Sequence, residues 1–524
     1  MSRSLLLLAT LVLGTSQVFG QSEGENRDML SGRALETLQQ IDQLLAARWQ
    51  ADEIQVAPPA DDSEFLRRVY LDLVGVIPRV AEVRAFLADH SPDKRSRTIN
   101  RLLDSPQHAT HMANTWRQIM LPAGIDLQQI QSVAGVQNWL RRQFAQNTRY
   151  DRIVSDFLVA TGGGEANPAL YYTSLELKPE KLAASTSRIF LGLQIECAEC
   201  HDHPFDHWTQ NDFWGYAAFF AQLDQSQAMN GGPQVRLIDL PGGEVTLPDS
   251  ETVVAPKYPD GRGVSESDSG TRRVQLAIWM ASRDNPFLAR AAVNRIWSQM
   301  FGRGLVEPVD DIGKHNPASH PELMELLTDE IVRSGFDVRH LMRLLANTRA
   351  YQLSSRTLDE GSAPDATFAR MAIKTMTSEQ LYDNLNRVLM RRPAQAPALF
   401  QAAQGVFDPR RLSFVAKMQM RGSNATEFEA GVLQALTLLN GTETAALTSV
   451  DQSGLLMALE APFFSHAERV DTLFLATLSR LPSETQRQQF VQYVDKGGAT
   501  GDAKQALSDV LWALLNSAEF TLNH

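Results

Sequence analysis

The chain has 524 residues and a formal net charge of −12, because its 61 Asp and Glu outnumber its 49 Lys and Arg. This length suggests about two to four domains with sizeable hydrophobic cores. Binding to nucleic acid requires many Lys and Arg to neutralise phosphates, so we expect no nucleic acid partner for this acidic protein.

Residues 1–20 have the pattern of a secretory signal peptide. Arg3 gives a positive start, residues 5–13 form an apolar core, and Gly20 offers a small residue for cleavage. The apolar core is too short for a comfortable membrane span, although an uncleaved N-terminal anchor is an alternative. We therefore expect an exported protein of the periplasm or cell surface, with no stable membrane span once the signal is removed.

Residues 30–224 predict a helical domain. In residues 65–73 apolar side chains recur at spacings of three and four, which is typical of an amphipathic helix. Residues 61–63 offer N-cap side chains before this helix, and Pro78 follows its end. Further helices are expected over residues 81–87, 97–103, 116–120, 136–144, 153–159 and 181–191.

Residues 225–270 are richer in Gly, Pro, Asp and Ser, and two short segments at 235–237 and 245–247 alternate as strands do. We expect a small β-rich insertion or linker there. A second helical domain is expected over residues 271–524. Its helices should cover residues 275–281, 286–301, 321–333, 338–347, 378–388 and 502–515. The predicted fold class is therefore mainly α, with two helical domains joined by this β-rich segment.

Both cysteines of the chain lie in one pentapeptide, Cys197-Ala198-Glu199-Cys200-His201. Cys-x-x-Cys-His is the attachment motif of a c-type haem, whose vinyl groups add the two thiols. The imidazole of His201 can then bind the iron. We expect one covalent haem c held by Cys197, Cys200 and His201. The ligand on the other face of the iron stays open in the sequence, with these candidates: any methionine, His207, His108, His111 and His320.

The same segment has two other interpretations. Two thiolates and two imidazoles at the spacing C-x2-C-x2-H-x3-H suit tetrahedral zinc. The four zinc ligands would be Cys197, Cys200, His203 and His207. Export would also allow a disulfide between Cys197 and Cys200, with the histidines as surface residues. Either alternative describes a non-redox binding or scaffold protein.

A second polar cluster lies in the C-terminal half. Its acidic and histidine side chains could bind a metal or transfer protons in acid–base chemistry. These candidate catalytic residues are Asp310, Asp311, His315 and His320. Helix capping is the alternative, since Ser319 stands where an N-cap residue would.

Long stretches of the chain resemble a known pair of domains. The planctomycete cytochrome-type domain of unknown function (PSCyt family) is similar to residues 61–73, 190–194, 197–206 and 219–220. The companion domain that usually follows it (PSD family) resembles residues 285–297, 301–306, 320–323, 349–354 and 512–520. The resemblance covers nearly all of the chain after the signal.

The resemblance implies an exported, mostly helical protein with a haem-c-like motif. Many relatives carry a further cytochrome c domain, but this chain has no second Cys-x-x-Cys-His, so residues 197–201 would hold its only haem. Relatives are associated with surface and polysaccharide-processing systems, which implies a redox partner protein or an extracellular, polysaccharide-related substrate. We therefore expect a haem-c-binding protein that works in electron transfer, or as part of a haem-dependent extracytoplasmic oxidoreductase.

Overall fold

The computed structural model describes residues 32–121, 130–163, 166–226, 236–264, 269–356, 364–390, 408–418, 441, 445 and 448–524. The prediction of a mainly helical chain with small β elements is confirmed. The signal peptide expected at residues 1–20 lies outside the described residues. The boundaries of the two expected domains stay predictions.

The first part of the chain is a series of helices. They are α1 (Gly32–Ala51), α2 (Asp62–Val74), α3 (Val80–Ala88), α4 (Lys94–Leu103), α5 (Pro106–Met120), α6 (Ile130–Ala145), α7 (Tyr150–Leu158), α8 (Ala169–Ser174) and α9 (Pro179–Thr186). Asp61 caps α2 by accepting a hydrogen bond from the Glu64 amide, and Gly75 ends the helix in the left-handed conformation, before Pro78. The helix expected over residues 116–120 is only the end of α5, which begins at Pro106, ten residues earlier than the apolar pattern indicated, with Ser105 as its N-cap.

Short turns and strands follow α9. They are the π-helical turn η2 (Ser187–Leu191), the 3-10 turn η3 (Glu196–Glu199), α10 (Gln210–Ala217), the 3-10 turn η4 (Ala218–Phe220), β1 (Leu223–Ser226), β2 (Arg236–Asp239), β3 (Val245–Thr246) and β4 (Val253–Val254). β1 pairs with β2, and β3 with β4, each antiparallel. β2 and β3 overlap the two strands expected from the sequence.

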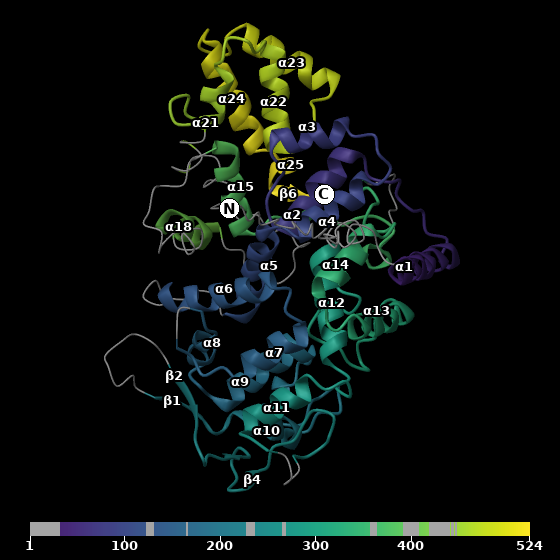
Figure 1. Ribbon diagram of the computed structural model, residues 1–524, viewed down its shortest axis with the longest axis vertical. Helices are drawn as coiled ribbons and strands as arrows, with labels where there is room; N and C mark the ends of the chain where they lie inside the picture. The colour runs from purple at the N-terminus through teal and green to yellow at the C-terminus, as the bar shows by residue number, and fades with distance from the viewer. Residues whose placement is uncertain are drawn as a thin grey trace, which may run out of the picture.

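The second helical part begins after these strands. Its elements are α11 (Arg272–Met280), α12 (Leu288–Phe301), α13 (Pro321–Arg333), α14 (Val338–Asn347), η5 (Asp365–Thr367), β5 (Lys374–Thr375), α15 (Ser378–Leu389), α18 (Pro409–Met418), α21 (Gly454–Leu459), α22 (His466–Leu478), α23 (Glu484–Asp495), α24 (Ala503–Leu515), α25 (Ala518–Thr521) and β6 (Leu522–Asn523). The long axis of the molecule runs from α22, α23 and α24 at the top of Figure 1 to α9, α10 and α11 at the bottom.

Two main clusters of buried apolar side chains hold these elements together. The larger cluster takes residues from both sides of the β segment, since Phe190 of η2 and Trp297 of α12 both belong to it. The smaller cluster joins α15 to the C-terminal helices. Helix α2 contributes to both, with Phe65 in the larger cluster and Leu71 in the smaller one. Burial on two faces explains why α2 is almost fully enclosed.

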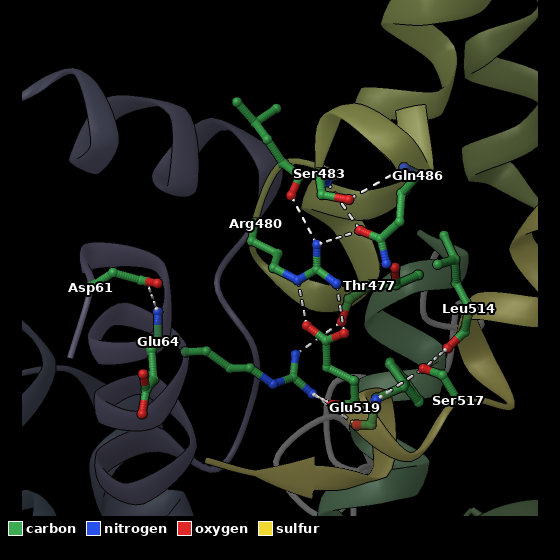
Figure 2. Close-up of polar contacts among 12 residues, drawn as sticks. Asp61, Glu64, Thr477, Arg480, Ser483, Gln486, Leu514, Ser517 and Glu519 are labelled. Carbon is green, nitrogen blue, oxygen red and sulfur yellow. Dashed lines mark hydrogen bonds and ion pairs between the residues drawn. The ribbon is translucent and has the colours of Figure 1, made fainter. Parts of the chain in front are cut away.

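Helix α2 also anchors the C-terminal segment through a buried arginine. Arg67 is 1% exposed and donates to the main-chain oxygens of Thr477 at 2.9 Å and Phe520 at 2.8 Å. Figure 2 shows Arg480 next to Glu519 in this segment, and their Nη2–Oε2 distance is 2.7 Å. These hydrogen bonds tie the end of the chain to its second helix.

A second buried network centres on Asp72 of α2. Its carboxylate accepts from Lys374 Nζ at 2.6 Å, from the Tyr351 hydroxyl at 2.8 Å and from Asn523 Nδ2 at 2.6 Å. Lys374 also donates to the Met300 main-chain oxygen at 2.7 Å. Because both charges are buried, each depends on the other for compensation.

Candidate functional site

A tight contact fixes the chain just before the cysteine motif. Helix α9 continues into η2, and Gly192 ends this turn at a φ of 67°. A Cβ on Gly192 would lie 2.8 Å from Ile312 Cδ1, and the Ile312 amide donates to the Gly192 oxygen at 2.8 Å. The lack of a side chain therefore lets the segment before the motif lie directly against the loop after α12.

We expect Gly192→Ala to lower the free energy of unfolding by roughly 1–3 kcal/mol, because left-handed backbone strain adds to a close contact with the end of the Ile312 side chain. Chemical denaturation would measure the loss. Gly261→Ala is the matched control, since Gly261 has a φ of 88° but no neighbouring atom within 4 Å of the added Cβ. Equal losses in the two variants would contradict a role for the contact with Ile312.

Cys197 and Cys200 lie on an exposed turn whose main chain accepts hydrogen bonds from helix α10. Cys197 and Cys200 are both exposed free thiols, whereas Ala198 between them is buried. Helix α10 supports the turn, because Trp214 Nε1 donates to the Glu199 oxygen at 3.0 Å and Gln210 Nε2 donates to the Cys200 oxygen at 3.1 Å. The turn thus presents both sulfur-bearing residues at the surface on a fixed backbone.

His201 follows on the same surface and is exposed. Its Nδ1 lies 2.8 Å from the Asp202 main-chain oxygen, a contact in which Nδ1–H donates. This hydrogen bond orients the ring and leaves Nε2 as the nitrogen with a lone pair for a metal. The Asp202 carboxylate accepts a hydrogen bond from the main-chain N–H of Gln210 at 2.8 Å.

The neighbouring histidines are bound to protein groups. His203 Nδ1 accepts from the Asp206 amide at 2.9 Å, and His207 Nδ1 lies 2.6 Å from Asp206 Oδ1. Burial acts to raise the pKa of Asp206, but hydrogen bonds from His207 and the charges of His207 and His315 outweigh it and hold the pKa below its usual value. Within the described ranges, no group of three or more His, Cys, Asp or Glu side chains is arranged to hold a metal ion.

The structure brings three of the four candidate catalytic residues of the C-terminal half to the surface around the cysteine turn. His315 Nδ1 lies 3.1 Å from Asp206 Oδ2, and its Nε2 lies 2.9 Å from Asp311 Oδ1. Asp310 Oδ1 accepts from Gln194 Nε2 at 2.9 Å. The site is therefore built from two segments more than 100 residues apart.

His320 lies elsewhere. It immediately precedes α13 and is 8% exposed, with its ring centroid 5.5 Å from that of Phe368. Burial lowers its pKa to about 4. His320 rather than Ser319 is the N-cap residue of α13, and its side chain makes no capping hydrogen bond.

His108 and His111 lie on α5, against α2. The His108 ring donates through Nδ1 to the Leu73 oxygen at 2.7 Å, and burial lowers the pKa of His108 to about 4. Burial also lowers the pKa of His111 to about 4. The hydrogen bond to Leu73 gives the His108 ring a structural role in α5–α2 packing.

The pKa of His108 predicts a pH dependence of stability. Its folded pKa of about 4 lies below the ordinary value of 6.5, so its contribution is complete above pH 6.5 and is lost as the pH falls toward 4. We expect the loss to reach about 3 kcal/mol per buried histidine. Denaturation at several pH values should show a smaller acid-limb slope in His108→Gln, and an unchanged slope in the exposed control His90→Gln. An unchanged slope in His108→Gln would contradict the prediction.

Sequence reasoning missed Arg188, Glu196 and Gln194, which connect the cysteine turn to the Asp310 loop. Arg188 lies inside a segment whose apolar pattern predicts a plain helix. Its partner Asp310 is 122 residues away, so no local signal marks the pair.

Together, the fold and the site define a mainly helical protein with an exposed Cys-x-x-Cys-His turn. Polar contacts link the chain around this turn to a loop from a second helical segment. Residues 40–225 match the family model PSCyt2, "Protein of unknown function (DUF1549)", and residues 272–396 match PSD1, "Protein of unknown function (DUF1553)". The chain therefore belongs to the proteins with the two-domain PSCyt–PSD arrangement. Searches of curated proteins and of solved structures each found no match.

The two matched regions meet at the candidate site. Gly192 and the cysteine turn lie in the PSCyt2 match, whereas Asp310 to His315 lie in the PSD1 match.

Among the residues that the structure describes, no helix combines the length and apolar character needed to cross a bilayer.

Proposed function

We propose that this chain is an exported electron-transfer protein that carries one covalent haem c. Cys197 and Cys200 hold the haem and His201 binds its iron. The observation that carries the proposal is the presence of two free, exposed thiols and an exposed imidazole on one surface turn. When bound, haem supplies one-electron oxidation and reduction.

The residues present fit this cofactor. Thioether formation needs thiols that the haem vinyl groups can reach, and neither thiol is buried or bonded to the other. Iron ligation needs an oriented imidazole with one free nitrogen, and the His201–Asp202 hydrogen bond supports that state. The fixed turn above α10 would limit the movement of both attachment points.

The second segment favours a wider role for the site. Asp310, Asp311 and His315 lie beside the cysteine turn and could bind or exchange protons with a molecule that approaches it. We therefore include action as part of an extracytoplasmic oxidoreductase, at the periplasm or cell surface. Its partner would be a redox protein or an extracellular, polysaccharide-related substrate.

A pyridine haemochrome spectrum combined with denaturing mass spectrometry tests the proposal. The protein should be exported from a host that has haem-c maturation machinery. We expect a c-type α band and a mass gain of one haem. A colourless chain that binds zinc, or that is lighter by two hydrogens through a Cys197–Cys200 disulfide, would overturn it and indicate a non-redox binding or scaffold protein.

A further inference from the structure

The Arg188 side chain, on η2, contacts both halves of the site. Its Nη2 pairs closely with Glu196 Oε1, and its Nη1 lies 3.5 Å from Asp310 Oδ2. Glu196 is the first residue of η3 and directly precedes Cys197. One guanidinium therefore connects the start of the cysteine turn to the loop after α12.

Other contacts run parallel to this bridge. Arg295 of α12 donates from Nη2 to the Arg188 main-chain oxygen at 3.2 Å. Gln194 also reaches Asp310, at 2.9 Å, and the Ile312 amide binds the Gly192 oxygen at 2.8 Å. Both the side chain and the backbone of η2 are thus held against the second family segment.

The local helix geometry places Arg188 between its two partners. Residues 187–191 form a π-helical turn rather than a continuation of α9, and such turns are frequent at functional sites. Partial burial acts to lower the pKa of Arg188, but the carboxylates of Glu196 and Asp310 raise it more strongly, so the guanidinium is charged.

We infer that Arg188 is a positioning residue that locks the cysteine turn to the loop at residues 310–316, so that the motif is held in place only with the second family segment docked. A planar guanidinium can bind two carboxylates at once, whereas a lysine ammonium cannot reproduce that fork. Without Arg188, the carboxylates of Glu196 and Asp310 would lie near each other with no charge between them. The locking itself does not depend on haem; its effect on a haem rests on the function proposed above.

Hydrogen exchange on the haem-free full-length chain tests the lock. The reporters are the Ala198 amide, which donates to Ile195 on the turn, and the Ile312 amide, which donates to Gly192 from the loop. We expect Arg188→Gln to speed exchange at both reporters about five- to tenfold, because each loses a shared restraint. Asp310→Asn should speed exchange at both as well, and the double variant should not exceed Arg188→Gln.

Arg290→Gln is the matched control, because Arg290 of α12 forms an exposed ion pair with Glu325 of α13, and its loss should change neither reporter. Faster exchange at Ala198 alone, with Ile312 unchanged, would overturn the inference. Additive effects of Arg188→Gln and Asp310→Asn would also overturn it, since they would show two independent contacts. The exchange experiment uses haem-free protein, so a negative result there is distinct from a failure of haem attachment.

The reduction potential of the haem-loaded protein gives a readout that loosening alone would not produce. Arg188→Gln removes a positive charge near Cys197 and should lower the potential, since it favours the oxidised haem. Asp310→Asn removes a negative charge and should raise it. Arg188→Lys should keep a potential near that of the unchanged protein while still showing faster exchange. Shifts of the same sign in Arg188→Gln and Asp310→Asn would contradict the placement of these charges at the motif.

Discussion

The double variant Cys197→Ala, Cys200→Ala is expected to carry no covalent haem. Both thioether bonds would be absent, so denaturing mass spectrometry should give the mass of the bare chain. The fold should persist, because both cysteine side chains are exposed. Circular dichroism and the thermal midpoint should therefore match those of the unchanged protein.

A separate variant, His201→Ala, should alter the iron spectrum while covalent attachment is retained, because the thiols remain. Glu199→Gln is a control within the motif, since it leaves both thiols and the imidazole in place. A double cysteine variant that still carried covalent haem would show that the attachment site lies elsewhere. Loss of haem in Glu199→Gln would show that the assay reports the folding of the turn rather than its chemistry.

Asp72→Asn is expected to lower the free energy of unfolding by roughly 3–5 kcal/mol, because it leaves the ammonium of Lys374 buried without a counter-charge. Asp72 and Lys374 are each about 5% exposed, and their side chains meet at 2.6 Å. The asparagine oxygen can still accept from Lys374 and Asn523, which share one oxygen of Asp72, and the asparagine NH2 can donate to the Tyr351 hydroxyl, so the main change is the loss of the negative charge. Guanidinium denaturation followed by circular dichroism would measure the loss.

The double variant Asp72→Asn, Lys374→Met should regain much of this stability, since neither charge is then buried alone. A surface pair provides the comparison. Asp365→Asn removes the partner of Arg370 at 2.8 Å, but Asp365 is half exposed, so its loss should be less than about 1 kcal/mol. If the double variant were as unstable as the sum of its two single variants, the ion pair would not be the source of the effect.

Some features of the fold followed from local patterns. The apolar spacing of residues 65–73 and the acidic N-cap before them predict α2, and the structure places α2 at Asp62–Val74. Lengths were less accurate, as in α5, where polar residues fill the first turns that Ser105 and Pro106 start. The single helix that the sequence predicts over residues 181–191 is α9 followed by the π-helical turn η2, which Gly192 ends in the left-handed conformation.

The candidate site was also predictable from the sequence only in part. The motif at residues 197–201 is contiguous, so the sequence alone locates it and limits its chemistry to haem attachment, zinc binding or a disulfide, and the structure adds that its thiols are free and exposed. The sequence grouped Asp310, Asp311, His315 and His320 because they are close along the chain. The structure separates His320, whose buried ring packs near Phe368, from the other three beside the motif.

The sequence by itself determined the helical class, the position of the Cys-x-x-Cys-His motif and the resemblance to the PSCyt and PSD families, which the family matches bear out. These features depend on spacings within about a dozen residues, which local chemistry sets. Only the tertiary structure decided that Arg188 meets Asp310 and that Asp72 meets Lys374, pairs 122 and 302 residues apart. Such pairs form because the burial of two apolar clusters, not local preference, brings distant segments together and requires their charges to find partners.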